Sequence, residues 1–424
     1  MPSTLSIEQR FAEILGTQNV HLAAEKDRVV GILPKLILEP ETEPQLAAAL
    51  AFASENNLSV IPRGGATKLH WGNPPKSADL ILSTARLDKI IEHAASDLTV
   101  TVEAGCTQRT LQEALAKRGQ RLALDPLFPN RATIGGILST NDSGALRLRF
   151  GGLRDLIIGV TLALPDGTLA SSGGKVVKNV AGYDLPKLAT GAFGTLGVIT
   201  RAVFRLHPVP WMSTTLTCAN ADPSQAQNLF AKILDSQLAC SAFQARVLDG
   251  KKLDTSIDIL FEGTQQGIDA QLSHLKSLAA PAIFEAAIGN VWQAREELLS
   301  HSAQLDSFNA IFKVSAIPAD AIPALKNLRN VASPQTNFQA VVQATGLGTI
   351  LLTGEKKEVH RLAIVFRERM ERAGGSLVAL GPALVSEGFD AWGNPGDAVS
   401  VMRAIKHQLD PKSTLNPGRF IGGI

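Results

Sequence analysis

The chain has 424 residues, a length that predicts two or three domains and excludes a single small module. Apolar residues make up 45% of it and charged residues 19%, which is typical of a globular protein and excludes a disordered or fibrous chain. The 41 Lys and Arg residues nearly balance the 39 Asp and Glu residues, so neither nucleic acid nor an anionic membrane is indicated as a partner. We expect a small-molecule substrate.

The cysteines and the N-terminal residues bear on the compartment. Cys106, Cys218 and Cys240 are odd in number and share no CxxC spacing, which argues against a disulfide framework, a zinc site and a cysteine-ligated iron–sulfur cluster. The first residues lack a basic stretch followed by an apolar run, and no stretch approaches 18 uninterrupted apolar residues. We expect a cytoplasmic chain without a transmembrane segment, which leaves docking to a membrane partner open.

The first half of the chain predicts short strands between helices. A helix is expected over 42–57, where Thr42 and Gln45 have the spacing of a capping box and an Ala- and Leu-rich run follows. A second helix is expected over 107–118. The apolar runs predict strands at 58–61, 79–82, 98–103 and 156–164.

The second half has a different pattern. Glycine is densest between 135 and 197, and after that, helical periods alternate with short strand-like runs. We expect helices at 222–239, 265–279, 319–332 and 355–373, and strands at 256–261, 310–314 and 347–353. Pro208 and Pro210 suit a linker, so a domain boundary is expected near 207–213.

A glycine-rich loop follows the strand at 58–61. In Pro62–Thr67 (Pro-Arg-Gly-Gly-Ala-Thr), adjacent glycines permit the positive φ angles that turn successive backbone N–H groups toward one anion. A plain strand-to-helix turn explains the loop equally well when it is considered alone. The loop is therefore a candidate cradle for a pyrophosphate.

Two further glycine-rich stretches support a ligand. Residues 132–144 place Gly135 and Gly136 beside small polar residues, a composition that lets the backbone approach a flat ring or a phosphate. Residues 187–200 form the third stretch and end in a strand. Three such stretches over roughly 130 residues indicate an elongated ligand, and a dinucleotide is long enough to reach all of them.

The two common nucleotide-binding motifs do not account for these stretches. No GxGxxG joins a strand to a helix, so a Rossmann site lacks its fingerprint. Gly173-Gly174-Lys175 lacks both the upstream glycine and the following Ser or Thr of a P-loop. Another dinucleotide-binding fold is therefore expected.

Taken in order, the motifs resemble the FAD-binding domain of the vanillyl-alcohol oxidase, or PCMH-type, flavoproteins. The residues that carry the resemblance are Glu39–Thr42, Pro62–Thr67, Val102–Gly105, Thr133–Ile137, Asn141, Gly144, Arg154–Asp155, Leu164–Gly167 and Gly191–Thr200. Near the end, Leu409–Phe420, with Trp392–Asn394 upstream, is similar to the closing motif of the glycolate and D-lactate dehydrogenase branch. Within that branch the chain most resembles FAD-binding subunits of glycolate oxidase.

The resemblance implies an α+β fold class. It implies a PCMH-type FAD-binding domain of two α/β subdomains and an α+β cap domain with an antiparallel sheet. The implied bounds are 1–29 for an N-terminal helical segment, 30–208 for the FAD-binding domain, 209–384 for the cap or substrate domain and 385–424 for a C-terminal segment that returns to the FAD-binding domain.

The resemblance also implies which residues hold FAD, mostly through backbone groups. The pyrophosphate would lie on Arg63, Gly64, Gly65, Ala66 and Thr67. One segment would run along the flavin and contains Thr133, Gly135, Gly136, Asn141 and Gly144. The last stretch would contact pyrophosphate and adenine and contains Gly191, Gly194, Thr195, Gly197, Val198 and Ile199.

The sequence departs from the family within and after the first loop. Ala66 stands where the family often has a third glycine, and a methyl group there is expected to be tolerated only if φ stays negative. Covalent members place a His in or directly after this loop, whereas the first His here is His70, so we expect non-covalent FAD. Cys106 is more typical of a buried apolar residue than of a ligand or nucleophile.

No catalytic residue is assigned from the sequence. Larger catalytic relatives carry paired histidines that bind a metal, whereas the histidines of the last third are widely separated, so no metal site is expected. Tyr183, with Lys178 and Lys187, is a candidate for the flavin edge or the substrate entrance, and a packing role with its hydroxyl at the surface is the alternative. The arginines that would suit a substrate carboxylate, Arg246, Arg361 and Arg367, are more typical of solvated charges on helices and strands.

Three functions stay open. The leading one is the FAD-binding subunit of a complex that oxidises glycolate to glyoxylate, with a larger flavoprotein subunit and an iron–sulfur subunit as partners, in the cytoplasm or at the inner face of the membrane. The second is a stand-alone FAD-dependent dehydrogenase of another 2-hydroxy acid or of an alcohol. The third is a subunit whose FAD is structural and whose role is assembly.

Overall fold

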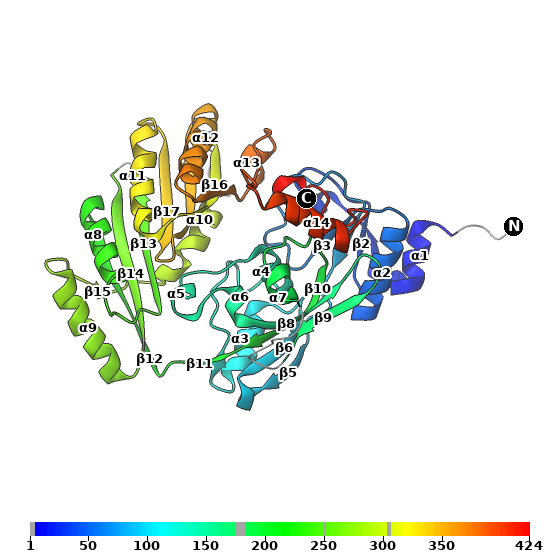
Figure 1. Cartoon of the computed structure of the whole chain (residues 1–424), viewed down its shortest axis with the longest axis horizontal. Helices are drawn as coiled ribbons and strands as arrows, with labels where there is room; N and C mark the ends of the chain where they lie inside the picture. The colour runs from blue at the N-terminus through cyan, green and yellow to red at the C-terminus, as the bar shows by residue number, and fades with distance from the viewer. Residues whose placement is uncertain (1–4, 175–182, 250–251, 303–306) are drawn as a thin grey trace. The chain divides into compact units, whose positions relative to one another are not determined.

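The computed structural model describes residues 5–174, 183–249, 252–302 and 307–424 (Figure 1). The chain divides into two compact units. The first unit contains Met1–Ser143, Gly152–Val209 and Asn394–Ile424, and the second contains Gly144–Gly151 and Pro210–Gly393. The second unit is therefore inserted into the first along the chain. No helix among the described residues is both long and apolar enough to cross a membrane.

The first unit begins with a small mixed sheet. Its strands are β1 (Val20–Leu22), β2 (Leu36–Leu38), β4 (Leu80–Ser83) and β3 (Val60–Arg63), in that spatial order. Strands β2 and β3 run parallel to β4, and β1 runs antiparallel to β2. Two helices pack on this sheet through a shared apolar core, α1 (Ile7–Leu15) and α2 (Glu43–Glu55).

Helix α2 confirms the helix expected over 42–57. The Thr42 hydroxyl accepts a hydrogen bond from the Gln45 N–H at 3.3 Å, which satisfies one of the free donors of the first turn. The capping box is incomplete, because the Gln45 side chain accepts from the N–H of Glu41 and not from that of Thr42. The helix ends at Asn56, as expected.

A second, antiparallel sheet completes the first unit. Its spatial order is β5 (Ile90–Ala94), β6 (Thr99–Glu103), β10 (Val198–Arg205), β8 (Ile157–Ala163) and β9 (Leu169–Gly173). A two-residue strand, β7 (Gln120–Arg121), pairs with β11 (His207–Pro208). The helices in this region of the chain are α3 (Gln108–Ala116), α4 (Ile134–Thr140), α6 (Leu153–Leu156) and α7 (Leu185–Ala189). The strands expected at 98–103 and 156–164 and the helix expected at 107–118 are confirmed.

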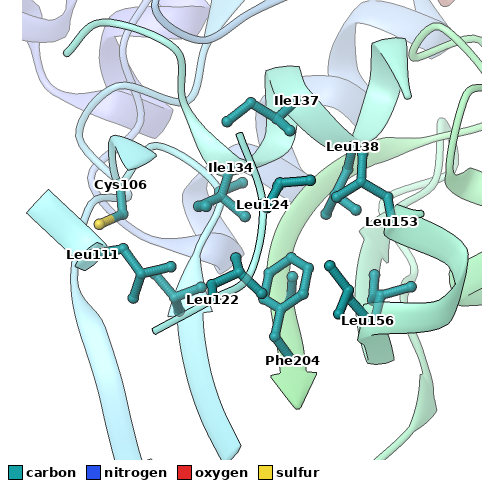
Figure 2. Close-up of a cluster of buried hydrophobic side chains, with 14 of the residues drawn as sticks. Cys106, Leu111, Leu122, Leu124, Ile134, Ile137, Leu138, Leu153, Leu156 and Phe204 are labelled. Atoms are coloured by element: carbon teal, nitrogen blue, oxygen red, sulfur yellow. The ribbon is translucent and has the colours of Figure 1, made fainter. Parts of the chain in front are cut away.

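An apolar core lies between this sheet and its helices (Figure 2). Phe204 of β10 is fully buried among leucines and isoleucines of α3, α4 and α6. Burying one such side chain contributes about 1.5–3 kcal/mol. This packing fixes the position of α4, because Ile134, Ile137 and Leu138 belong to the core. The two glycines of α4 are not part of this apolar cluster.

The glycine-rich stretch at 132–144 is therefore partly helical. Thr133 caps α4, since its hydroxyl accepts from the Gly136 N–H at 3.4 Å. Gly135 lets α4 approach Ala104, the residue after β6, because an added Cβ would lie 2.9 Å from the Cβ of Ala104. Asn141 ends the helix in the left-handed conformation, with φ at 47°.

The second unit is one antiparallel sheet with helices. The spatial order is β15 (Glu285–Ala286), β12 (Met212–Ala221), β14 (Asp254–Gly263), β13 (Ala242–Asp249), β17 (Asn337–Gln343), β18 (Leu347–Thr353), β16 (Asn309–Ser315) and β19 (Ser376–Ala379). Helices α8 (Pro223–Leu234), α9 (Gln265–Ala279) and α11 (Ala321–Val331) contribute to the core on one face (Figure 1). The remaining helices of this unit are α5 (Arg147–Phe150), α10 (Ala294–Ser302), α12 (Lys356–Arg372) and α13 (Pro382–Val385).

The elements expected in this half are confirmed, with strands added. Helices α8, α9, α11 and α12 and strands β14, β16 and β18 occupy the expected ranges. Strands β12, β13 and β17 were not expected. The last helix of the chain, α14 (Val399–Leu409), belongs to the first unit.

Candidate cofactor-binding site

A pocket of about 720 Å³, a volume that includes solvent at its mouth, opens in the first unit. Its walls are the loop Pro62–Leu69, the side of α4 that carries Gly135, Gly136, Ser139 and Thr140, and two pieces of the third stretch, Phe193–Gly194 and Gly197–Ile199. Thr84, Thr133, Asn416 and Arg419 complete the lining. The three glycine-rich stretches of the sequence thus meet around one cavity.

Most of the residues expected to hold a cofactor line this pocket: Arg63, Gly64, Gly65, Ala66, Thr67, Thr133, Gly135, Gly136, Gly194, Gly197, Val198 and Ile199. Asn141, Gly144, Gly191 and Thr195 are not among the lining residues. Asn141 packs against Gly191, whose N–H donates to the carbonyl of Leu138, so both lie at the end of α4. Thr195 is buried, and Gly144 belongs to the second unit.

The loop Gly64–Thr67 offers a row of free donors. Within the described part of the chain, none of its four backbone N–H groups donates to another protein group. Ala66 has a φ of 57°, and a change to the left-handed conformation within a turn directs successive N–H groups toward one point. Such a loop binds an anion through its backbone.

Close packing explains the two glycines before Ala66. A Cβ on Gly64 would lie 2.0 Å from the Thr133 hydroxyl oxygen, and one on Gly65 would lie 1.8 Å from the Arg131 carbonyl oxygen. A side chain at Gly65 would therefore displace protein backbone before it met any ligand. The expectation that Ala66 keeps a negative φ is wrong. Ala66 adopts a positive φ with an exposed methyl group, at a cost of about 1–2 kcal/mol.

Positive charge gathers around the loop. Lys68 lines the pocket, and its Nζ lies 3.0 Å from Oδ2 of Asp142, with both side chains almost fully buried at 4% and 3% exposure. The guanidinium of Arg419 also lines the pocket, where burial lowers its pKa to about 10. No Asp or Glu is among the described residues that line the cavity. Asp142 balances the charge of Lys68, so the free N–H donors and the positive charge of Arg419 are what fit a pyrophosphate.

The side chain of Arg63, which lines the pocket as expected, also has a partner in the N-terminal part of the chain. Its Nη1 donates to Oδ1 of Asp27 at 2.8 Å, so its guanidinium is held by the N-terminal part of the chain. Burial alone would raise the pKa of Asp27, but hydrogen bonds from the Ala24 N–H and from Arg63 outweigh burial and lower that pKa. Arg63 thereby anchors the start of the loop.

Several lining residues were missed by sequence reasoning. Lys68 directly follows the loop, and its charge gave no signal apart from that position. Asn416 and Arg419 belong to the closing motif Leu409–Phe420. The resemblance of that motif to the family was the signal that could have identified them as site residues. The Asn416 side chain donates to the Phe193 carbonyl at 2.7 Å, and Arg419 donates to the carbonyls of Leu69 and Trp71.

Neither His70 nor any of the cysteines is among the described residues that line the pocket. His70 is an exposed residue. Loss of water around its ring and the charges of Arg419 and Lys68 lower the pKa of His70, which favours the neutral ring. Cys106 is buried as expected, and burial, with Asp88 and Glu103 nearby, raises its pKa to about 11. The thiol is therefore protonated at neutral pH.

The arginines considered for a substrate carboxylate are already engaged. Arg246 binds both carboxylate oxygens of the buried Asp258, at 2.6 and 2.9 Å. Arg361 pairs with Glu358 and the carbonyl of Val331. Arg367 donates to three carbonyls, those of Leu377, Asp390 and Ala391.

The other catalytic candidates are dispersed. Tyr183 is 90% exposed, and Lys178 lies outside the described residues. His301, His360 and His407 lie on three different helices, α10, α12 and α14. Among the residues with described positions, no group of three His, Cys, Asp or Glu side chains could hold a metal ion.

Comparisons with known proteins agree with this site. Residues 34–173 match the family described as "FAD binding domain", a range that includes the first loop and α4. The chain is 26% identical to the glycolate oxidase subunit GlcD of Bacillus subtilis, over 92% of this chain and 89% of that protein. It is also 26% identical to the mitochondrial D-2-hydroxyglutarate dehydrogenase of Bos taurus, over 91% of this chain and 77% of that protein.

A solved structure supports the fold. The chain superimposes on p-cresol methylhydroxylase with a TM-score of 0.77, at 14% identity, over 97% of this chain and 95% of that one. The fold class expected from the sequence is confirmed. The chain therefore has the PCMH-type FAD-binding fold. The match to the FAD-binding domain family and the similarity to the two oxidoreductases named above identify it as an FAD-binding, FAD-dependent oxidoreductase.

Proposed function

We propose that FAD occupies the pocket of the first unit, with its pyrophosphate on the backbone N–H groups of Gly64–Thr67. The observation that carries this assignment is the row of free donors beside Lys68 and Arg419. Val198, Ile199 and the pocket-lining side of α4 would line the path of the remaining cofactor. When bound, FAD supplies a hydride acceptor, and the residues around it bind and orient it.

We propose that the substrate is a small 2-hydroxy acid, oxidised at its CH–OH carbon. Support comes from the two similar dehydrogenase-related proteins, whose names specify glycolate and D-2-hydroxyglutarate. Oxidation removes a hydride from the carbon and a proton from the hydroxyl. Glycolate, which gives glyoxylate, is the first candidate, and another 2-hydroxy acid or an alcohol is the alternative.

We further propose that the chain acts as a GlcE-like FAD-binding subunit of a glycolate-oxidising complex. The second unit would serve as the cap or substrate domain. A larger flavoprotein subunit and an iron–sulfur subunit would be its partners, in the cytoplasm or at the inner face of the membrane. The three buried cysteines of this chain share no cluster-binding motif, so an iron–sulfur relay would belong to a partner.

A second candidate function is a subunit that binds FAD but leaves substrate oxidation to its partner. The observation that favours it is the engagement of Arg246, Arg361 and Arg367 in contacts within the second unit. These contacts leave no assigned carboxylate ligand or base among the candidates that the sequence offers.

Anaerobic titration distinguishes these functions. The purified FAD-loaded chain is mixed with glycolate, D-lactate or D-2-hydroxyglutarate, alone and after co-expression with its partners, and the flavin absorbance is followed. Bleaching of the isolated chain indicates a stand-alone dehydrogenase, and bleaching of this chain's flavin only in the complex indicates the GlcE-like role. A flavin that stays oxidised with every substrate in both preparations contradicts the proposed oxidation.

A further inference from the structure

A buried lysine outside the pocket joins two of its walls. The Nζ of Lys406, on α14, donates to the carbonyl of Thr195 at 2.8 Å and to the carbonyl of Leu415 at 2.9 Å. It also contacts Oδ2 of Asp410 at 2.5 Å. Thr195 lies within the third glycine-rich stretch and Leu415 within the closing motif. One ammonium group therefore connects segments that are more than 200 residues apart in the chain.

Asp410 extends this connection along the closing motif. Its carboxylate is fully buried and accepts from the N–H groups of Thr414 and Leu415, each at 2.8 Å. Each oxygen thus receives a backbone donor, which offsets the cost of burying the charge. The backbone at 414–415 is held in place by the same ion pair that holds Thr195.

The stretch fixed by this pair reaches the pocket directly. The Val60 N–H donates to the Thr414 carbonyl at 2.8 Å, and the Asn416 N–H donates to the Val60 carbonyl at 2.9 Å, so 414–416 pair with the start of β3. Strand β3 leads into the Gly64–Thr67 loop. Asn416 then lines the pocket and donates to the carbonyl of Phe193, another lining residue.

We propose that Lys406 is a positioning residue for FAD, because it holds the third glycine-rich stretch and Asn416 in the arrangement that the pocket requires. This inference depends on the proposed placement of FAD. Lys406 does not line the cavity, so its effect would pass through Thr195 and Leu415. Occupation of the pocket and order in residues 409–420 would then be coupled, each favouring the other.

The test compares two lysines of the same region. Lys406→Met removes the buried ammonium, and Lys412→Met is the matched control, because Lys412 is exposed and donates to the Ser54 carbonyl at 2.9 Å. FAD is titrated into each apo-protein, and hydrogen exchange of a peptide covering 409–420 is measured with and without FAD. We expect Lys406→Met to weaken FAD binding on the order of tenfold or more.

The exchange measurement separates positioning from general destabilisation. In the wild type and in Lys412→Met, FAD should slow exchange over 409–420, whereas in Lys406→Met this protection should be lost. Peptides of the second unit should exchange equally in all variants. The visible circular dichroism of FAD, at saturation, should also change only in Lys406→Met. Wild-type affinity with wild-type protection in Lys406→Met would overturn the proposal.

Two further variants keep the test decisive. Asn416→Gly is used if Lys406→Met does not fold, since Asn416 has a φ of 45°, which glycine accepts. The variant removes the hydrogen bond that the Asn416 side chain donates to Phe193 and the one that it accepts from Arg419. Unchanged affinity and protection in Asn416→Gly would overturn the proposal. Gly136→Leu tests the pocket itself: if it binds FAD normally, both the FAD placement and this inference fail. A defect in Gly136→Leu with normal Lys406→Met removes only the inference.

Discussion

The guanidinium of Arg63 and the carboxylate of Asp27 form an ion pair at 2.8 Å, with side-chain exposures of only 15% and 7%. The pair connects the N-terminal part of the chain to the last residue of β3, directly before the loop Gly64–Thr67. We expect Asp27→Asn to lower the free energy of unfolding at pH 7 by roughly 2–3 kcal/mol, because Arg63 would keep its charge in a nearly buried position.

The effect of Asp27→Asn should depend on pH. The folded-state pKa of Asp27 lies below 3.8, so its carboxylate contributes stability above that pH and loses the contribution as the pH falls through the folded value. Urea unfolding of both proteins at pH 7 and near pH 3 measures this. The difference between wild type and variant should shrink at the lower pH, and a constant difference would show that the charge of Asp27 is unimportant.

Ala66→Gly should stabilise the protein. The left-handed conformation costs alanine about 1–2 kcal/mol, and glycine avoids this cost while adding about 0.5–1 kcal/mol of unfolded-state entropy. We expect a net gain of about 0.5–1 kcal/mol in urea unfolding of the apo-protein. The control is Ala114→Gly in α3, where the same replacement should cost about 1 kcal/mol. A loss of stability in both variants would contradict the strain assigned to Ala66.

Gly136→Leu should empty the pocket without unfolding the chain. An added Cβ at Gly136 meets only the Thr133 hydroxyl oxygen within 4 Å, at 3.3 Å. Because Gly136 lines the pocket, a longer side chain would extend into the cavity. The flavin-to-protein absorbance ratio after purification measures occupancy, and circular dichroism measures folding. Gly381→Leu is the control, because a Cβ there meets nothing within 4 Å and the position lies in the second unit.

The three thiols should be unreactive in the native protein. Burial raises the pKa of Cys106 to about 11 and that of Cys240 to about 12, and burial also raises the pKa of Cys218. Because the thiolate is the reactive form, a disulfide reagent at pH 8 should modify none of them quickly. All three should react in denaturant. Rapid modification of Cys106 in the native state would contradict its burial against β6.

The local elements were predictable because their signals are local. Helix α2 has Thr42 before it and an Ala- and Leu-rich interior, and both signals survive in the fold. Strand β12 was missed because Met212–Ala221 is rich in Ser and Thr and lacks a clear apolar alternation. Strand β14 was expected, although it has a charged residue, Asp258, at its centre. Asp258 is buried there because Arg246 of the neighbouring strand pairs with it. Such pairing arises only after the strands meet.

The glycines of the site could be predicted from the sequence, whereas its charged residues could not. Gly64 and Gly65 are required by close approach to Thr133 and Arg131, and a Gly-Gly pair reports that requirement in the sequence. Lys68 and Asp142 are separated by more than 70 residues, and each alone is typical of a surface residue. The positive φ of Ala66 also could not be read from its residue type.

The insertion of Pro210–Gly393 into the first unit has a consequence for biosynthesis. A ribosome releases the glycine-rich stretches early, and Asn416 and Arg419 emerge only after the whole inserted unit has been made. Until Leu415 pairs with Val60, the nascent first unit therefore lacks one wall of its pocket and leaves part of its apolar core exposed. Stable flavin capture would follow translation, and the supply of free FAD at that moment would influence how much of the newly made protein escapes aggregation.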